Sequence, residues 1–122
     1  MSQHKQELGK KGEDLAAAYL RKKGYEIVAR NYRSGRAEID ILAQKDGWLI
    51  VVEVKTRETD AYGAPEESVG ISKINMLVQG VESYMLDKDL DCQVRYDIIS
   101  IILNTYKKEI THLEDAFWPG LY

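Results

Sequence analysis

Three charged residues interrupt the most apolar part of the chain, in the stretch AEIDILAQKDGWLIVVEVKTR at residues 37–57. Asp40 precedes a turn signal, and Glu53 and Lys55 follow the apolar run WLIVV. Carboxylate oxygens are the ligands that Mg²⁺ prefers, and a lysine beside them can orient a water molecule or contact a phosphate oxygen. Residues of these types suit the metal-assisted hydrolysis of a phosphodiester, which requires neither cysteine nor histidine.

The dipeptide Asp46-Gly47 predicts the turn that brings these charges together. A two-residue type I′ turn requires positive φ at both central positions, and Asp-Gly suits it. In the resulting register Asp40 lies opposite Glu53, with a Cβ separation of about 4.5–5.5 Å. Like charges at this distance repel, and a bound Mg²⁺, or Mn²⁺ in its place, would offset the repulsion. The backbone carbonyl of Val54 is a candidate third ligand.

The same register divides the hairpin side chains between two faces, because strand side chains alternate with period two. One face is predicted to carry the charged residues with Leu42 and Val51. The other is predicted to carry the apolar residues Ile39, Ile41, Ile50, Val52 and Val54. A shift of one residue would separate Asp40 from Glu53.

The alternative is that Glu38, Asp40, Glu53 and Lys55 form a solvated ladder of salt bridges on an exposed sheet face. Charged strand faces of this kind are common. Glu53 and Lys55, however, follow an apolar run that is typical of a buried strand, where charge without a partner costs several kcal/mol by order of magnitude. Their position favours the metal site.

Helical and strand periodicities place the hairpin in an α/β fold. A helix, three strands, a second helix and a strand are predicted in that order, at residues 5–23, 25–32, 37–43, 47–55, 72–86 and 94–103, with a further edge strand in the tail. Gly24 is expected to end the first helix and Ser72 to cap the second. The residues from 94 to 103 are almost continuously apolar after Asp97, which indicates a strand covered on both faces. The order predicts an αβββαβ sandwich with a mixed central sheet flanked by helices, in a single domain over 1–122.

The charge is distributed unevenly along the chain. Residues 1–57 contain 12 Lys and Arg against 8 Asp and Glu, whereas residues 58–122 contain 5 against 12, for a net charge of −3. A net acidic chain does not coat nucleic acid indiscriminately, so a polyanion is expected to bind the first half. Candidate phosphate contacts, with scattered surface charge as the alternative, are Lys10, Lys11, Arg30, Arg33, Arg36, Arg57 and Lys73.

The cysteine content and the hydropathy of the chain indicate where the protein is located and which kinds of site it lacks. Cys92 is the only cysteine, which excludes an internal disulfide and a thiolate zinc cluster. The N-terminus lacks the apolar block of a signal peptide, and no stretch reaches the roughly 18 to 20 apolar residues of a membrane span. A cytoplasmic location is therefore expected. Neither His4 nor His112 is assigned a role.

The charged motif resembles that of a known nuclease superfamily. EID at residues 38–40, followed after 12 residues by EVK at 53–55, resembles the PD-(D/E)xK motif, and the predicted element order is similar to that superfamily's core. Almost the whole chain further resembles the bacterial YraN-like family of predicted endonucleases, which is related to archaeal Holliday junction resolvases. The resemblance lies in GKKGEDLAAAYL, GYEIVARNYR, AEIDILA, VVEVKTR, YGAPEESV and RYDII.

The resemblance implies a Mg²⁺-dependent endonuclease that hydrolyses DNA, with branched or irregular DNA as the expected substrate and a homodimer as the expected assembly. It implies that Asp40 and Glu53 hold the metal, that Lys55 is the catalytic lysine, and that Glu13 completes the site from the first helix. One departure is Ala37, where relatives usually have Gly. Two alternatives remain: a nucleic-acid-binding module with little or no turnover, and an interaction protein that docks through its acidic second half.

Overall fold

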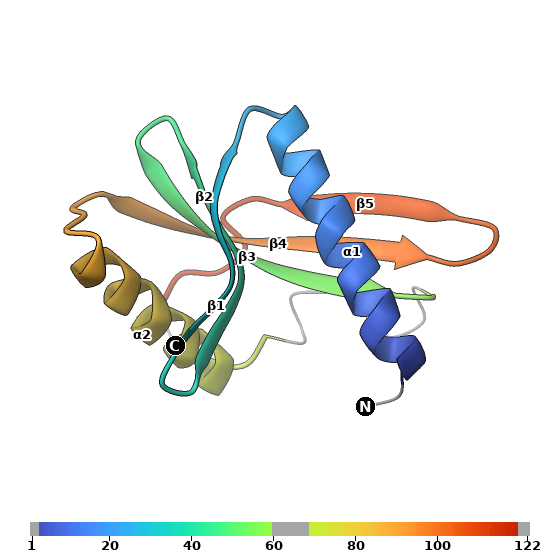
Figure 1. The fold of residues 1–122 in the computed structure, drawn as a ribbon, viewed down its shortest axis with the longest axis horizontal. Helices are drawn as coiled ribbons and strands as arrows, with labels where there is room; N and C mark the ends of the chain where they lie inside the picture. The colour runs from blue at the N-terminus through green and yellow to red at the C-terminus, as the bar shows by residue number, and fades with distance from the viewer. Residues whose placement is uncertain (1–2, 60–68, 120–122) are drawn as a thin grey trace.

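The computed structural model describes residues 3–59 and 69–119, which form one mixed five-stranded sheet with a helix on each face (Figure 1). The strand order is β1-β2-β3-β4-β5, and only β3 and β4 pair in parallel. The elements are α1 (Gln3–Lys22), β1 (Glu26–Ser34), β2 (Ala37–Lys45), β3 (Trp48–Arg57), α2 (Ile71–Asp87), β4 (Gln93–Leu103) and β5 (Lys108–Leu113). The predicted αβββαβ order and mixed sheet are confirmed.

The β2–β3 hairpin has the predicted turn, and the predicted register holds from the pair Lys45–Trp48 to the pair Ile41–Val52. The predicted pairs Asp40–Glu53 and Glu38–Lys55 are not part of the ladder. Asp46 and Gly47 have φ of 53° and 82°, as a type I′ turn requires. Ile41 pairs with Val52, and the pairing continues regularly to the turn. Beyond Ile41 and Val52, on the side away from the turn, the regular ladder stops. The two strands therefore separate at the position of Asp40.

The separation of the strands changes the predicted faces. Ile39 packs with Leu42 and Val51 in the cluster beneath α2, whereas Ile41 lies in the cluster beneath α1. The assignment of Ile39 to the face of Ile41 is therefore wrong. Strict alternation holds only while a strand keeps its ladder, and β2 leaves its ladder with β3 at Asp40.

Helix α1 covers one face of the sheet with small residues. Ala16, Ala17 and Leu20 are fully buried against the β-strands, and Gly24, with φ of 92°, ends the helix as predicted. The Tyr25 N–H donates to the Leu20 carbonyl at 2.9 Å, which closes the last turn. Neither α1 nor α2, the helices of the described ranges, has the length and apolar character that a membrane crossing requires.

Gly12 allows α1 to approach β3, and its replacement provides a test of this packing. A Cβ atom at Gly12 would overlap the side chain of Thr56, so Gly12→Ala is expected to lower the free energy of unfolding by about 1–3 kcal/mol. Gly9→Ala is the matched control, because nothing lies within 4 Å of its Cβ position and alanine favours a helix by up to about 1 kcal/mol. Urea denaturation would compare the two. Equal stability of both variants would contradict close packing at Gly12.

Helix α2 covers the other face and begins one residue earlier than predicted. Its N-cap is Gly70, which makes no side-chain hydrogen bond, and the Ile74 N–H donates to the Gly70 carbonyl at 3.0 Å. The prediction of Ser72 as the cap is therefore wrong, because the extended backbone that precedes the helix lies at Gly70. Gly80 lies close to β2, where an added Cβ would be 3.1 Å from the Cβ of Ala37. Ala37 is buried and packs under α2.

Candidate active site

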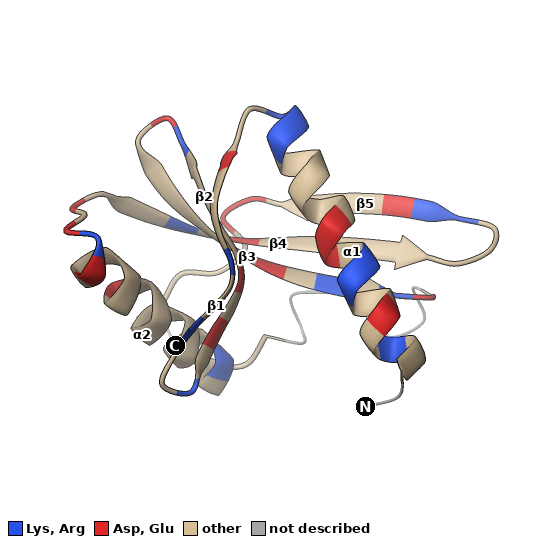
Figure 2. Ribbon diagram, viewed as in Figure 1, with Lys and Arg blue, Asp and Glu red and all other residues tan. Residues whose placement is uncertain are grey.

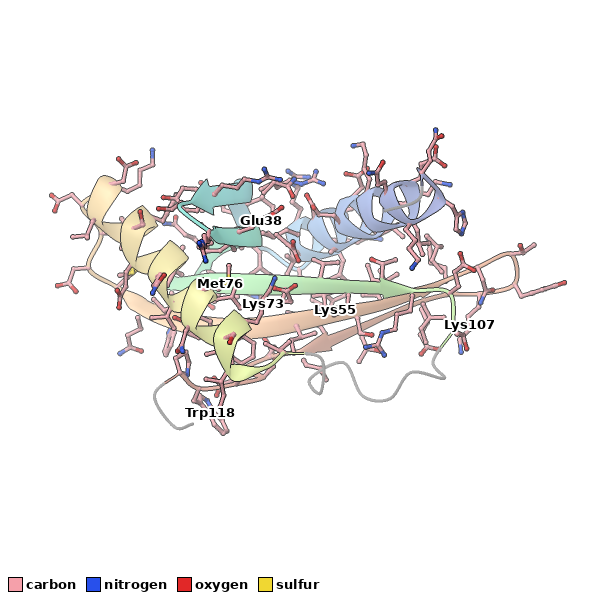
Figure 3. The ribbon with its side chains drawn as sticks, turned by 90° about the horizontal axis from the view of Figure 1, so that it is seen from below. Glu38, Lys55, Lys73, Met76, Lys107 and Trp118 are labelled. Atoms are coloured by element: carbon pink, nitrogen blue, oxygen red, sulfur yellow. The ribbon has the colours of Figure 1, made fainter. Side chains whose placement is uncertain are left out.

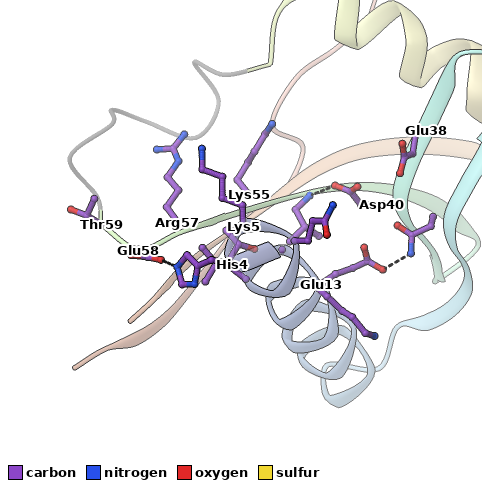
Figure 4. Close-up of a pocket in the computed structure, with 16 residues that line it drawn as sticks. His4, Lys5, Glu13, Glu38, Asp40, Lys55, Arg57, Glu58 and Thr59 are labelled. Carbon is purple, nitrogen blue, oxygen red and sulfur yellow. Dashed lines mark hydrogen bonds and ion pairs between the residues drawn. The ribbon is translucent and has the colours of Figure 1, made fainter. Parts of the chain in front are cut away.

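An open groove of about 1040 Å³ runs between the N-terminal half of α1 and the C-terminal end of β3 (Figure 4). Four of the predicted site residues line this groove, namely Glu13, Asp40, Val54 and Lys55. Two of the candidate phosphate contacts, Lys10 and Arg57, line it as well. Segments distant in the sequence therefore contribute to one cavity, as the nuclease interpretation requires.

Asp40 lies at the point where β2 and β3 separate. Its Oδ2 accepts a hydrogen bond of 2.8 Å from the Val54 N–H, so the side chain takes a strand amide that the ladder leaves unpaired. Burial and then the negative charge of Glu53 raise the pKa of Asp40 to about 7, and the Val54 N–H and the Lys73 ammonium group only partly oppose them. A carboxyl group whose pKa is raised by burial and by a neighbouring negative charge is typical of a functional site.

Glu53 is buried, with 4% of its surface exposed, and it does not line the groove itself. Two ammonium groups neutralise it: Lys55 Nζ lies 3.6 Å from Oε1, and Lys73 Nζ lies 3.5 Å from Oε2. Oε2 nevertheless makes no hydrogen bond, so the Lys73 contact is an ion pair by distance and not an aligned hydrogen bond. Lys73 thus lies beside the predicted metal ligand.

Glu13 is held at the groove by β1. Its Oε1 accepts hydrogen bonds from Arg30 Nε at 3.0 Å and Asn31 Nδ2 at 2.9 Å, and Arg30 also binds Asp14 at 2.6 Å. Asn31 has a positive φ of 52° within β1, and the register with β2 is the same on both sides of it. Arg30, predicted as a phosphate contact, is therefore a partner of α1 acids and positions Glu13.

Basic and acidic residues are interspersed along α1, as the blue and red segments of Figure 2 show. Lys10 forms an ion pair of 3.7 Å with Asp14, and Arg33 forms one of 3.5 Å with Glu38. Lys11 and Arg36 are exposed. The basic side chains of the first half therefore do not gather into one surface of a single sign, although Lys10, Lys55 and Arg57 share the groove.

A second group of ionisable residues, which the sequence did not indicate as a unit, lies around Asp97. Asp97 is fully buried on β4 and accepts hydrogen bonds from Arg95, His112 and the Asp115 N–H, at 2.7–3.0 Å. Burial raises the pKa of Asp97, but the hydrogen bonds from His112, Arg95 and Asp115 outweigh it and hold the pKa below the ordinary value. The only sequence signal was an acid inside an apolar strand.

The ligand atoms of Asp97, His112 and Glu114 all lie within 4.8 Å of one another, a spacing that a metal ion could use. Arg95 lies within this group, 2.7 Å from Asp97 and 3.2 Å from Glu114, and already supplies the positive charge. Since the partners of Asp97 are protein groups, this group is a structural anchor between β4, β5 and the β1 end. Asp40, Glu53 and Glu13 are not drawn together as tightly in the described part of the chain.

Comparison with known proteins places the chain in a family. The model described as "Uncharacterised protein family UPF0102" matches residues 12–101, which include Glu13, Asp40, Glu53, Lys55 and Lys73. The chain is 48% identical to a UPF0102 protein of Christiangramia forsetii and 45% identical to one of Flavobacterium psychrophilum, covering 97% of this chain and 98% of each relative. It is 43% identical to a UPF0102 protein of Bacteroides thetaiotaomicron over the full length of both. The chain therefore belongs to the UPF0102 family, the YraN-like family that its motifs resemble.

Proposed function

We propose that this protein is a metal-dependent endonuclease that hydrolyses phosphodiester bonds of DNA, with branched or irregular DNA as its substrate. The observation that carries the proposal is the pair Asp40 and Glu53. Glu53 is buried and Asp40 is half-buried, and burial together with the negative charge of Glu53 raises the pKa of Asp40 to about 7. Lys55 lies 3.6 Å from Glu53 and lines the groove together with Asp40. Burying two carboxylates near each other is unfavourable unless positive charge offsets their repulsion, and a divalent cation would offset it more fully than the ammonium groups of Lys55 and Lys73.

The donor set fits a hard divalent cation such as Mg²⁺ or Mn²⁺. Asp40 and Glu53 offer carboxylate oxygens, and the Oε2 atom of Glu53 is buried without a hydrogen bond. The Val54 carbonyl is the third candidate ligand, and Mg²⁺ usually completes its shell with water. When bound, the cation would lower the pKa of a coordinated water and neutralise charge on the phosphoryl group.

The surrounding residues have distinct roles in this proposal. The Lys55 ammonium group, on the groove side of Glu53, would orient the attacking water or contact a phosphate oxygen. Glu13, fixed by Arg30 and Asn31, would accept a hydrogen bond from water at the opposite wall. Lys10 and Arg57 would position the DNA backbone along the groove without reading sequence. Cleavage of both strands would then need a second copy of the chain.

A cleavage assay tests the proposal and separates it from a binding module on the same fold. Single-stranded, duplex, flap and four-way DNA would be incubated with Mg²⁺ or with EDTA. We expect cleavage of at least one substrate with Mg²⁺ alone, and a loss of about 10²-fold or more in Lys55→Ala, because the lysine acts on the reacting groups. If wild type and Lys55→Ala retain DNA equally and cleave none, the protein is a binding module.

A further inference from the structure

Lys73 approaches the site from α2, on the opposite side of the sheet from α1. Figure 3 shows it beside β3, with Lys55 further along the same strand. Its ammonium group lies 3.5 Å from Glu53 Oε2, and its charge partly opposes the rise in the pKa of Asp40 that burial and Glu53 cause. Lys73 therefore acts on both of the carboxylates proposed to hold the cation, although it belongs to neither of their strands.

The contact between Lys73 and Glu53 differs from the well-aligned ion pairs elsewhere in the molecule. Arg95 binds Asp97 through two hydrogen bonds of 2.7 and 2.8 Å, and Asp97 is left with no unpaired oxygen. Glu53 Oε2 is buried and has only a non-hydrogen-bonded ammonium group nearby. The Lys73 side chain is 38% exposed. Its ammonium group can therefore move away from Glu53 and remain in contact with water.

We propose that Lys73 is a displaceable counter-charge: it neutralises Glu53 in the metal-free protein and leaves Oε2 when a divalent cation binds. The inference rests on the proposed function, because it assumes that Glu53 is a metal ligand. An ammonium group and a divalent cation beside the same carboxylate oxygen repel each other and compete for its lone pairs. Lys73 therefore keeps the empty site folded at the expense of metal affinity.

Competition gives an effect on metal affinity that is opposite in sign to that of a merely structural ion pair. If Lys73 competes with the cation, its removal strengthens metal binding. If Lys73 only orients Glu53, its removal leaves the carboxylate less well positioned and weakens binding or leaves it unchanged. Metal affinity in the absence of DNA therefore distinguishes the two roles and does not depend on catalytic activity.

Calorimetric titration of the full-length protein with Mn²⁺ tests the inference. Lys73→Gln is expected to bind Mn²⁺ about threefold to tenfold more tightly than wild type. Lys73→Arg, which keeps the charge, is expected to bind much as wild type does. Lys88→Gln is the matched control, because Lys88 lies at the other end of α2 and pairs with Asp87 at 3.8 Å. Thermal unfolding would verify that each variant is folded.

The possible outcomes separate this inference from the proposed function. If wild type binds Mn²⁺ clearly and Lys73→Gln binds it equally or more weakly, the proposal that the cation displaces Lys73 is wrong. The proposed metal site would still be supported. A similar gain in Lys88→Gln would also overturn the displacement of Lys73, because the effect would then be one of net charge alone. The absence of Mn²⁺ binding in both wild type and Lys73→Gln would overturn the metal site and this inference with it. If Lys73→Gln fails to fold, Lys73→Met, which keeps most of the side-chain volume, takes its place under the same criteria.

Discussion

Asp40→Asn is expected to lose metal-dependent DNA cleavage by about 10³-fold or more while making the metal-free protein more stable at pH 8. Asparagine keeps an oxygen that can accept the Val54 N–H, so the local structure is preserved. It removes the negative charge that the cation would need. The same change removes a buried charge and its repulsion by Glu53, the two causes that raise the pKa of Asp40 to about 7.

The sign of the pH dependence follows from that raised pKa. The folded state binds a proton at Asp40 below about pH 7, whereas the unfolded chain binds it only below its ordinary pKa of 3.8. The stability of wild type relative to Asp40→Asn should therefore fall as the pH rises from about 4 to about 7, and level off above. The total difference is on the order of a few kcal/mol. Urea denaturation of both proteins without metal, at pH 5 and pH 8, would measure this difference. If wild type were the more stable protein at pH 8, the raised pKa of Asp40 would be contradicted.

Asp97→Ala is expected to lower the free energy of unfolding by about 3 kcal/mol or more. The change leaves the Arg95 guanidinium group and the largely buried His112 ring without the acceptor that they share. Because the folded-state pKa of Asp97 is lowered, its contribution is fully present above pH 4 and is lost as the pH falls below that value. Glu109→Ala is the control, since it removes only an exposed 3.3 Å pair with Lys107.

Urea denaturation at pH 7 and at pH 3 would measure the effect of Asp97→Ala. A loss no larger than that of Glu109→Ala, or a loss that persists undiminished at pH 3, would contradict the role of Asp97 as a charged anchor. Asp97 and Asp40 are thus two acids with opposite pKa shifts. Asp97 accepts hydrogen bonds from Arg95, His112 and the Asp115 N–H, whereas Asp40 accepts one from the Val54 N–H and is the acid proposed to bind the cation.

The local features of the fold were predictable because they depend on short-range rules. Asp46-Gly47 specifies a turn with positive φ, and the turn fixes the register of the hairpin as far as Ile41 and Val52. Gly24 ends the first helix for the same reason. The αβββαβ order followed from periodicities of two and 3.6 residues. Nothing in these features requires knowledge of distant contacts.

The features that the sequence did not indicate depend on contacts between distant segments. Ile39 changes face because β2 leaves its partner strand, which alternation alone does not reveal. Arg30 resembled a phosphate contact until the structure placed it against Glu13. His112 was assigned no role because its partner Asp97 lies 15 residues away on a neighbouring strand. Most of the stretch YGAPEESV, one of those that carry the family resemblance, lies outside the described residues.

Anomalous X-ray diffraction from crystals soaked in Mn²⁺ tests most directly whether Asp40 and Glu53 share a cation. We expect one strong anomalous peak at bonding distance from a carboxylate oxygen of each residue, with the Val54 carbonyl among the ligands and Lys73 moved away from Glu53. The site would be contradicted by carboxylates that diverge with no peak between them, or by a peak found instead beside Asp97, His112 and Glu114.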